Sequence, residues 1–441
     1  MELEKLKNKK ILILGLGKEG LDALNFLKKN CLAKKIGVAD KNPNCRKKIE
    51  KRKFSGVEWH LGENYLKALK KYDLIVKSPG IPIHLPEVEE AFERKKITSL
   101  TEIFFENCPG KIIGVTGTKG KGITASLIYS ILKVAKMPVR LIGNIGQPGL
   151  NFLDKAKKDE FFVYEISSHQ LYRLKESPQI AVFTNLYPAH LDYFKDKEEY
   201  FLAKKNIFLW QKKDDLLIYN AEDKNLKKFV QKAKSKKIPV KNFSEIIKKY
   251  RIKNLFLKNF YPLNLALAIR VGEIFNLKKS EIEKGIENFK PLPHRLELVG
   301  KFKKILFIDD SLSTIPESTI FALNSLGNKI GSLILGGYDS KLDYKNLAKE
   351  ILKKRIKTLI LFPETGNKIW REIIKFKNKK RWPRAILVQK MRDAVKLAFW
   401  YTEKGKICLL SPGSPSFGLF KDYRERGNLF KKYVRYYGRS R

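Results

Sequence analysis

The chain has 441 residues and 43% of them are hydrophobic, which is enough apolar material for several cores and favours two to four domains. Lys and Arg number 91 against 46 Asp and Glu, a formal net charge of +45 that favours polyanionic partners such as nucleic acid or an anionic membrane. The lysines are scattered through every segment, however, and compositional bias explains that pattern without a dedicated nucleic-acid surface.

The four cysteines are far apart and form neither a CxxC pair nor a disulfide framework, so we expect a reducing interior and no zinc site. Near the N-terminus only residues 11–14 form an apolar run, which is too short for a signal peptide, and no run approaches the roughly 18 residues of a membrane span. We therefore expect a cytoplasmic protein that has no membrane partner. We also expect a monomer, although these patterns do not bear on the oligomeric state.

The first block of the chain has the pattern of a nucleotide-binding unit. A strand is expected at 11–14, a helix near 20–29 and a second strand that ends at Asp40. Between them stands Gly15-Leu16-Gly17-Lys18-Glu19-Gly20, whose glycines let the backbone approach a pyrophosphate at a helix N-terminus. The same loop could be an ordinary tight turn, and taken alone it would also suit a nicotinamide-dependent oxidoreductase.

The second block begins after Pro109-Gly110 and the third after Pro291-Leu292-Pro293, and both alternate short apolar runs with helical stretches. Strands are expected near 111–118, 138–142, 160–164, 179–185, 215–219, 304–309, 331–335, 357–362, 384–389 and 406–410, with a helix near 262–276. The predicted fold class is α/β in three domains, 1–108, 109–291 and 292–441. The outer two are Rossmann-like, and the central one is a parallel sheet of the P-loop ATPase type.

A phosphate-binding loop opens the second block. In Gly114-Val-Thr-Gly117-Thr118-Lys119-Gly120-Lys121-Gly122, backbone N–H groups can enclose phosphates and Lys121 can reach the β- and γ-phosphate oxygens. The loop is irregular, because five residues separate Gly114 from Gly120 and because Gly122 stands where a Ser or Thr usually meets magnesium. The nearest hydroxyls belong to Thr118, Thr124 and Ser126.

Two further motifs follow strands of the second block, Glu165-Ile-Ser-Ser-His-Gln-Leu and Thr184-Asn185-Leu-Tyr-Pro-Ala-His190-Leu-Asp192. Open parallel sheets bind ligands at the carboxyl ends of their strands. Beside ATP phosphates, the Glu165 carboxylate and the His190 imidazole could hold magnesium, although His190 alone would be an ordinary loop histidine. Two nucleotide sites in one chain favour two phosphorylated substrates over one redox cofactor.

The motifs occur together in the order of one family. The series GVTGTKGKG, Gly143-Asn144-Ile-Gly146, EISSHQL, TNLYPAHLD, Tyr200-Phe-Leu-Ala-Lys204, Asn264-Leu-Ala-Leu-Ala, His294-Arg295-Leu-Glu297 and Leu335-Gly-Gly resembles the Mur ligases and their folylpolyglutamate synthetase relatives over nearly the whole chain. The C-terminal segment from Ser411 to Gly427, the Gly15 loop and Ser78-Pro79-Gly80-Ile81 look like the D-glutamate-adding branch of the Mur ligases.

The resemblance implies an ATP-dependent amide ligase of peptidoglycan precursor synthesis. Its domains would bind the UDP-linked substrate, ATP and the amino acid, in chain order. The implied substrates are ATP, UDP-N-acetylmuramoyl-L-alanine and D-glutamate, and the implied cofactor is magnesium, as two ions. The γ-phosphoryl of ATP would move to the L-alanyl carboxylate, and the amine of D-glutamate would attack the acyl phosphate after closure of the domains.

Site residues follow from the resemblance position by position. Lys121, Glu165, His190 and Lys204 are the implied catalytic residues. The implied ATP contacts are Gly117, Thr118, Lys119, Gly120, Lys121, Gly122, Asn264, Arg295 and Asp310. The implied magnesium ligands are Glu165, His190, a carbamylated Lys204 and Thr124. The implied contacts with the UDP-linked substrate are Gly15, Leu16, Gly17, Asp40, Ser78, Pro79, Gly80 and Asn144, and those with D-glutamate are Lys341, Ser416 and Tyr423.

Several positions depart from the family pattern. Gly122-Ile123 replaces a Ser-Thr pair, which leaves open which hydroxyl meets magnesium, and the order Gly-Lys-Gly is similar to the folate branch. Leu312 stands where many members have lysine, so one cation is missing from the amino-acid site. Phe260-Tyr261 replaces a His-Asn pair, and Gly418 replaces an Asp. None of these changes removes a catalytic carboxylate or the phosphate lysine.

Three alternatives remain. A folylpolyglutamate synthetase or another Mur ligase would share the ATP chemistry, but the separate block before Pro109, with its own glycine loop, argues against the folate enzyme. A basic nucleic-acid-binding protein would use the net charge of +45. A nicotinamide oxidoreductase would use the Gly15 loop alone.

Overall fold

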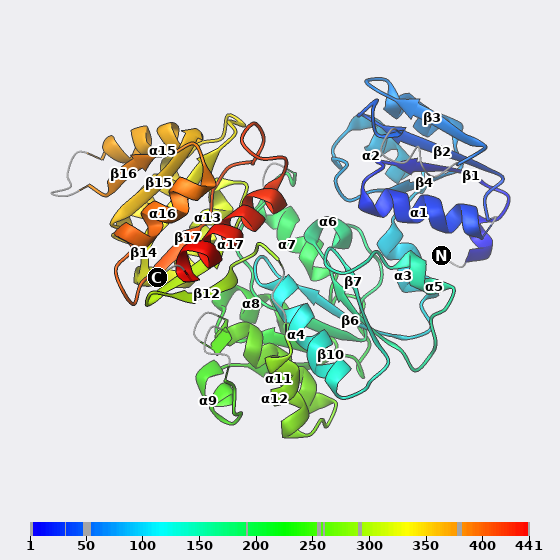
Figure 1. Cartoon of the computed structure of the whole chain (residues 1–441). Coiled ribbons are helices and arrows are strands. Elements are labelled where there is room, and N and C mark those ends of the chain that lie inside the picture. The colour runs from blue at the N-terminus through cyan, green and yellow to red at the C-terminus, as the bar shows by residue number, and fades with distance from the viewer. Residues whose placement is uncertain are drawn as a thin grey trace. The chain divides into compact units, whose positions relative to one another are not determined.

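The computed structural model describes residues 3–30, 32–46, 54–190, 193–253, 257–258, 261–289, 293–376 and 382–439. The chain forms two compact units, Met1–Phe289 and Lys290–Arg441, and each is built from mainly parallel β-sheets with helices on their faces (Figure 1). The first unit holds two sheets and the second holds one. The predicted fold class, α/β with three sheet-based domains, is therefore confirmed.

A five-stranded parallel sheet in the order β3-β2-β1-β4-β5 forms the N-terminal part of the first unit. Its central strand is buried on both faces: Ile11 and Ile13 share an apolar cluster with helix α1, whereas Leu12 and Leu14 share one with η3 and α2. Burial on both faces explains the unbroken apolar run in the sequence. The elements are η1 (Leu3–Leu6), β1 (Lys10–Leu14), α1 (Lys18–Lys29), β2 (Lys35–Asp40), β3 (Val57–Leu61), η3 (Tyr65–Lys71), β4 (Leu74–Lys77), α2 (Pro86–Glu93), β5 (Ile97–Thr98) and α3 (Leu100–Asn107).

The central part of the first unit is a six-stranded parallel sheet in the order β11-β10-β9-β6-β8-β7. Helix α4 packs on β6, β7 and β8, and α11 and α12 pack on α4. Phe162 and Tyr164 of β8 contact Phe104 of α3 edge to face, so one apolar cluster links this sheet with the N-terminal sheet. The strands are β6 (Lys111–Thr116), β7 (Val139–Gly143), β8 (Phe161–Glu165), β9 (Ile180–Phe183), β10 (Leu216–Asn220) and β11 (Lys236–Val240). The helices are α4 (Lys121–Val134), α5 (Leu150–Leu153), α6 (Ser168–Leu171), α7 (Lys197–Lys205), α8 (Lys224–Phe229), η4 (Val230–Lys232), α9 (Phe243–Lys248), α11 (Pro262–Ile274) and α12 (Lys279–Glu287).

The second unit has one six-stranded sheet in the order β12-β13-β17-β14-β15-β16. Only β12 runs antiparallel to its neighbour. Its strands are β12 (Glu297–Phe302), β13 (Ile305–Asp309), β14 (Ile330–Gly337), β15 (Thr358–Glu364), β16 (Arg384–Leu387) and β17 (Ile407–Leu410). Its helices are α13 (Pro316–Leu326), η5 (Gly327–Lys329), α14 (Lys345–Lys353), α15 (Thr365–Ile374), α16 (Met391–Tyr401) and α17 (Tyr423–Arg439).

The strands expected from the sequence are present with ends shifted by a few residues. Five strands were not expected: β3, β4, β5, β11 and β12. Most of them lie at sheet edges and carry polar residues, so they lack the long apolar run that marks a central strand. The domain boundaries at 108/109 and 291/292 stay predictions, and the second falls at residues 290–292, outside the described residues.

Two other residues named in the sequence analysis, Asp192 and Phe260, also lie outside the described part of the chain, as does Cys31, one of the four cysteines. Among the described residues, no helix is both long and apolar enough to span a bilayer.

Candidate functional site

The loop between β6 and α4 has a backbone that requires glycine at two positions. Gly117 has φ +148° and Gly120 has φ +81°, both values that side-chain-bearing residues rarely adopt. A Cβ at Gly117 would overlap the hydroxyl of Thr184, and one at Gly120 would overlap the amide of Asn264. Gly120 is also the N-cap of α4, so the loop ends where a helix N-terminus offers free N–H groups and a partial positive charge. This is the geometry that binds phosphates.

Neighbouring strand ends hold this loop in place. Asn185 accepts a hydrogen bond from the N–H of Lys119 through Oδ1 (2.8 Å) and donates one to the Lys119 carbonyl through Nδ2 (3.0 Å). The hydroxyl of Thr184 donates to the same carbonyl (2.6 Å). On the other side, Asn264 donates from Nδ2 to the Gly120 carbonyl (3.0 Å). The loop is thus fixed before any ligand arrives.

Lys204 is a buried amine at the base of the loop. Only 1% of its surface is exposed, and its Nζ donates to the Gly117 carbonyl (2.7 Å) and the Thr116 hydroxyl (3.4 Å). Burial lowers the pKa of Lys204 well below the usual lysine value, and the nearby charge of Lys121 lowers it further, while the Glu165 carboxylate opposes the shift. Burial therefore favours the neutral amine of Lys204 over its ammonium form.

Glu165 and His190 lie at the same edge of the central sheet. Glu165 is the last residue of β8 and is 6% exposed, next to Val115 of β6 in the sheet register. His190 follows β9 and is exposed, with its ring centroid 6.0 Å from that of Tyr200. The structure therefore places the predicted metal residues around the phosphate loop. Their role as ligands stays a prediction.

Tyr200 connects these residues. It belongs to the motif Tyr200-Phe-Leu-Ala-Lys204, but no function was predicted for it. Its hydroxyl donates to Oγ1 of Thr118 (3.0 Å), and the Nζ of Lys204 lies 5.1 Å from its ring. Tyr200 and Lys204 are four residues apart on α7 and so project from the same helix face. The four-residue spacing in the sequence was the signal that could have placed Tyr200 in the same site as Lys204.

The hydroxyls proposed to replace the loop Ser or Thr differ in their surroundings. Thr124 has no exposed surface, and its Oγ1 accepts from Nδ2 of Asn264 (2.9 Å). Thr118 is partly exposed and donates to the Tyr187 carbonyl (2.9 Å). Which of them would meet magnesium stays open, but the buried hydroxyl of Thr124 would first have to leave Asn264.

The first glycine loop brings together four residues predicted to contact the UDP-linked substrate. The N–H of Leu16 donates to Oδ2 of Asp40 (2.7 Å), and the hydroxyl of Ser78 donates to the Gly15 carbonyl (2.6 Å). Gly15 has φ +89°, and a Cβ at Gly20 would overlap the Gly15 carbonyl. The backbone of this loop thus needs glycine at positions 15 and 20, whereas Gly17 has φ −75° and room for a Cβ. Gly17, Pro79 and Gly80 lie on the same turns.

Polar contacts continue between the N-terminal and central sheets. Lys18 donates to the Gly146 carbonyl (2.9 Å), next to the predicted substrate contact Asn144, which is exposed. Glu19 accepts from Nε2 of Gln170 (2.6 Å), and burial raises the pKa of Glu19 to about 7. Asp22 accepts from the N–H of Leu150 (3.1 Å), and burial raises its pKa to about 6.

A cavity of about 610 Å³ lies between the same two parts of the first unit. Of the predicted site residues, Pro79 alone is among the described residues that line this cavity, and the phosphate loop contributes none. The cavity is therefore distinct from the phosphate site. Its lining includes basic and aromatic side chains, among them Lys77, His169, Tyr172 and Trp210.

In the second unit, Asp310 is committed to internal hydrogen bonds. It is 3% exposed, and its carboxylate accepts from Ser313 (2.6 Å), Ser411 (2.7 Å) and the N–H of Leu296 (3.1 Å). Burial is the main reason why its pKa is raised to about 7. Asp310 thus fixes the turn that carries the exposed Arg295, and its predicted contact with ATP remains untested.

The predicted D-glutamate residues lie in loops of the second unit and at the start of α17. Lys341 is exposed and has φ +57°, with its N–H bonded to Asp339 (2.9 Å). Ser416 is 4% exposed, and the carbonyl of Tyr423 accepts from the hydroxyl of Ser311 (2.8 Å). Gly418, which replaces an Asp of the family pattern, has φ +82°, a backbone conformation that favours glycine.

Arg426 ties two of these loops together and was only part of a motif in the sequence. Its guanidinium has no exposed surface and donates to the Ser311 hydroxyl (3.0 Å), the Ser311 carbonyl (2.9 Å) and the Ser414 carbonyl (3.0 Å). Burial lowers its pKa to about 10. Arg426 therefore holds the loop around Leu312 against the loop around Ser416.

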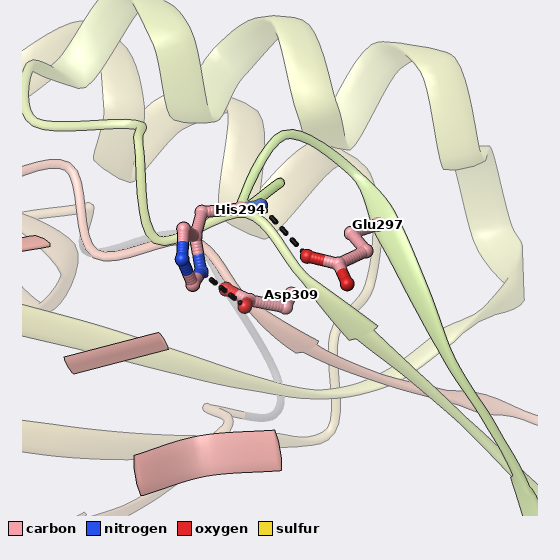
Figure 2. Close-up of side chains that lie close together, drawn as sticks. All are labelled: His294, Glu297 and Asp309. Atoms are coloured by element: carbon pink, nitrogen blue, oxygen red, sulfur yellow. Dashed lines mark hydrogen bonds and ion pairs between the residues drawn. The ribbon is translucent and has the colours of Figure 1, made fainter. Parts of the chain in front are cut away.

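His294, Glu297 and Asp309 form a cluster whose ligand atoms lie within 4.8 Å of one another (Figure 2). Nδ1 of His294 forms a hydrogen bond with Asp309 (2.8 Å), and the backbone N–H of His294 donates to Glu297 (2.8 Å). The ammonium of Lys431 donates to both oxygens of Glu297 (2.9 and 3.1 Å) and lies 3.9 Å from Asp309. A lysine thus supplies the cation here, and the cluster is best explained as a network that shapes the His294–Glu297 turn.

Two family descriptions match the chain, "Mur ligase MurD-like, N-terminal domain" over residues 9–98 and "Mur ligase middle domain" over residues 115–271. A UDP-N-acetylmuramoylalanine–D-glutamate ligase of Acetivibrio thermocellus is 34% identical over 98% of this chain and 97% of its own length. One of Clostridium tetani is 34% identical over 97% of each chain.

Solved structures agree on the fold. A UDP-N-acetylmuramate-alanine ligase of Thermotoga maritima has a TM-score of 0.57 and 15% identity, covering 98% of this chain and 99% of its own. A folylpolyglutamate synthase/dihydrofolate synthase of Yersinia pestis has a TM-score of 0.53 and 14% identity, covering 77% of this chain and 92% of its own.

Proposed function

The chain belongs to the Mur ligase family, and on that premise we propose that it adds D-glutamate to UDP-N-acetylmuramoyl-L-alanine, with hydrolysis of ATP, in peptidoglycan precursor synthesis. The observation that carries the proposal is the similarity to D-glutamate ligases at 34% identity over nearly the full length of both chains. A partial match would support only shared ATP chemistry. The N-terminal match over residues 9–98 further favours a UDP-linked acceptor over a folate.

The phosphate loop would bind the ATP phosphates through its N–H groups and Lys121. A γ-phosphoryl group carries charge that must be neutralised as it moves to the acceptor carboxylate. Lys121 on the first turn of α4 and the positive end of that helix would supply part of this neutralisation. The resulting acyl phosphate would be attacked by the amine of D-glutamate, giving the amide, ADP and phosphate.

Magnesium fits the residues at this edge. The Glu165 carboxylate, the His190 imidazole and a carbamate on Lys204 would hold it, and Thr124 is a further candidate. When bound, magnesium would draw charge from the phosphate oxygens. Carbamylation requires a neutral amine, which attacks carbon dioxide, forms an N–C bond and releases one proton. The depressed pKa of the buried Lys204 supports this chemistry.

The remaining elements of the proposal come from the sequence. Gly15, Leu16, Gly17, Asp40 and the Ser78–Gly80 turn would hold the uridine diphosphate, and Asn144 would contact the muramoyl part. Lys341, Ser416 and Tyr423 would hold D-glutamate, while Arg295 and Asp310 would serve ATP. Two magnesium ions, a monomeric state and a cytoplasmic location belong to the same proposal.

Phosphate release tests the proposal directly. The purified protein is given ATP, magnesium and UDP-N-acetylmuramoyl-L-alanine with D-glutamate, L-glutamate, L-lysine or meso-diaminopimelate. We expect release with D-glutamate above all others, and none from Lys121→Ala. Preference for another amino acid would assign a different branch of the family, and near-normal release by Lys121→Ala would refute the phosphate-loop assignment. A reduced folate in place of the UDP-linked acceptor, with L-glutamate, tests the folate alternative.

A further inference from the structure

One side chain links the turn after β4 to the loop that carries His190. The hydroxyl of Tyr193 donates to the Ile81 carbonyl (3.0 Å) and accepts from Nζ of Lys77 (3.2 Å). Ile81 ends the Ser78–Ile81 turn of the N-terminal sheet, whereas Tyr193 belongs to the central sheet's loop. Both hydrogen bonds therefore cross between the two parts of the first unit.

Lys77, the partner of Tyr193, belongs to the N-terminal sheet. It is 7% exposed, at the end of β4, and its ammonium also donates to the Ser78 carbonyl (3.2 Å). Burial lowers its pKa to about 8, and the charge of Glu19 partly offsets this. A lysine buried to this degree depends on its few acceptors, so Tyr193 and Lys77 fix each other.

On the central side, Tyr193 lies directly against His190. The backbone N–H groups of Tyr193 and Phe194 both donate to the His190 carbonyl (3.1 and 3.0 Å). His190 has φ +57°, a left-handed conformation that is uncommon for a residue with a side chain. The ring of His169 stands 4.0 Å from the Tyr193 ring and 4.9 Å from the His190 ring, centroid to centroid.

We propose that Tyr193 is a positioning residue that couples the turn of the UDP-linked substrate to the magnesium residue His190, and that Lys77 anchors it. This inference rests on the proposed function, because it uses the roles assigned there to Ser78–Gly80 and to His190. Substrate bound to the turn would favour the arrangement in which Tyr193 holds His190 in place. Each ligand would then strengthen the binding of the other, since a coupling free energy between two sites is reciprocal.

Titration calorimetry measures this coupling. The dissociation constant of UDP-N-acetylmuramoyl-L-alanine is determined with and without magnesium and a non-hydrolysable ATP analogue. In the unmodified protein we expect the nucleotide to tighten substrate binding about tenfold. Tyr193→Phe keeps the ring but loses both hydrogen bonds between the two parts of the unit. In this variant the ratio of the dissociation constants without and with nucleotide should fall close to one. Lys77→Met should act in the same direction.

Tyr250→Phe is the matched control, because it removes one tyrosine hydroxyl bonded to Glu273 (2.9 Å) within the central part of the unit and should keep the full ratio. A ratio near one in the unmodified protein, or an unchanged ratio in Tyr193→Phe, would overturn the proposal.

A second measurement needs no ligand and separates this inference from the proposed function. Hydrogen exchange of the Tyr193 and Phe194 amides should become about tenfold faster in Tyr193→Phe and Lys77→Met, and should stay unchanged in Tyr250→Phe. Unchanged exchange in the first two variants would refute the link even if the enzyme proves to be a D-glutamate ligase. Faster exchange without substrate binding would instead refute the proposed function and retain the link.

Discussion

The two units each bury a basic side chain beside loops of the predicted site, and the two side chains are held differently. Lys204 in the first unit has two acceptors, a carbonyl and a hydroxyl, and its pKa is far below the usual value. Arg426 in the second unit reaches three acceptors on two loops and keeps a pKa of about 10.

The difference follows from the chemistry of the two side chains. An ammonium loses its proton when water is removed and few acceptors replace it, which leaves a nucleophilic amine. A guanidinium stays charged and spreads its donors over a fixed fork, so it can join several carbonyls at once. We infer that burial makes Lys204 reactive and makes Arg426 a structural tie.

The largest expected effect is the loss of activity in Lys204→Ala. Phosphate release should fall more than about 1000-fold, or roughly 4 kcal/mol in activation free energy, because the anion proposed to help hold magnesium is gone. The thermal unfolding midpoint should fall modestly, since the variant leaves the Gly117 carbonyl without this donor and opens a small cavity. Formate should restore part of the activity by replacing the anion. Normal activity in this variant would rule out carbamylation, and Lys205→Ala serves as the neighbouring control.

The second prediction, for Arg426→Met, concerns stability rather than activity. It leaves the Ser311 and Ser414 carbonyls without their donor inside the protein, which should lower the free energy of unfolding by about 3 kcal/mol. Urea unfolding followed by circular dichroism measures this change, with the exposed Arg424→Met as control. If the variant kept its stability but lost D-glutamate binding, Arg426 would be a ligand residue and the contrast with Lys204 would fail.

The third prediction concerns the loop that Arg426 holds. Leu312 takes the place of a lysine found in many relatives, and its N–H bonds the His294 carbonyl (2.9 Å), so its backbone is already fixed. Leu312→Lys should lower the Michaelis constant for D-glutamate at least tenfold, because one charge-assisted contact contributes about 1.5–3 kcal/mol. Steady-state kinetics at saturating ATP measures it. An unchanged or higher constant would mean that neighbouring basic residues already supply the charge.

The last prediction is a pH dependence of stability that comes from Asp310. Its pKa is raised from 3.8 to about 7 in the folded protein, so between these values the folded state keeps a proton that the unfolded chain has lost. Stability should therefore fall as pH rises from about 4 to 7, by at most about 1.4 kcal/mol per pH unit, and this contribution should level off above 7. In Asp310→Asn this part of the slope should disappear from urea unfolding curves. An identical slope in both proteins would show that Asp310 is ionised throughout.

Much of the predicted site can be checked against the structure. The phosphate loop and Glu165 lie at one edge of the central sheet, and Lys204 of α7 bonds the loop, while their roles stay predictions. Asp40 and Ser78 both bond the Gly15 loop. Thr124 and Asp310, in contrast, are more deeply buried and more fully hydrogen-bonded than a motif could reveal. Tyr193, Lys77 and Arg426 received no role from the sequence.

The sequence by itself determined the α/β class, the central strands and the order of the two glycine loops, because apolar runs and obligatory glycines are local signals. It also identified the family, through motifs whose order needs no coordinates. Only the tertiary structure decided which polar groups are buried and what satisfies them. The pKa of Lys204, the acceptors of Arg426 and the bond from Tyr193 to Ile81 join residues far apart in the chain, and burial is a property of packing that no local pattern records.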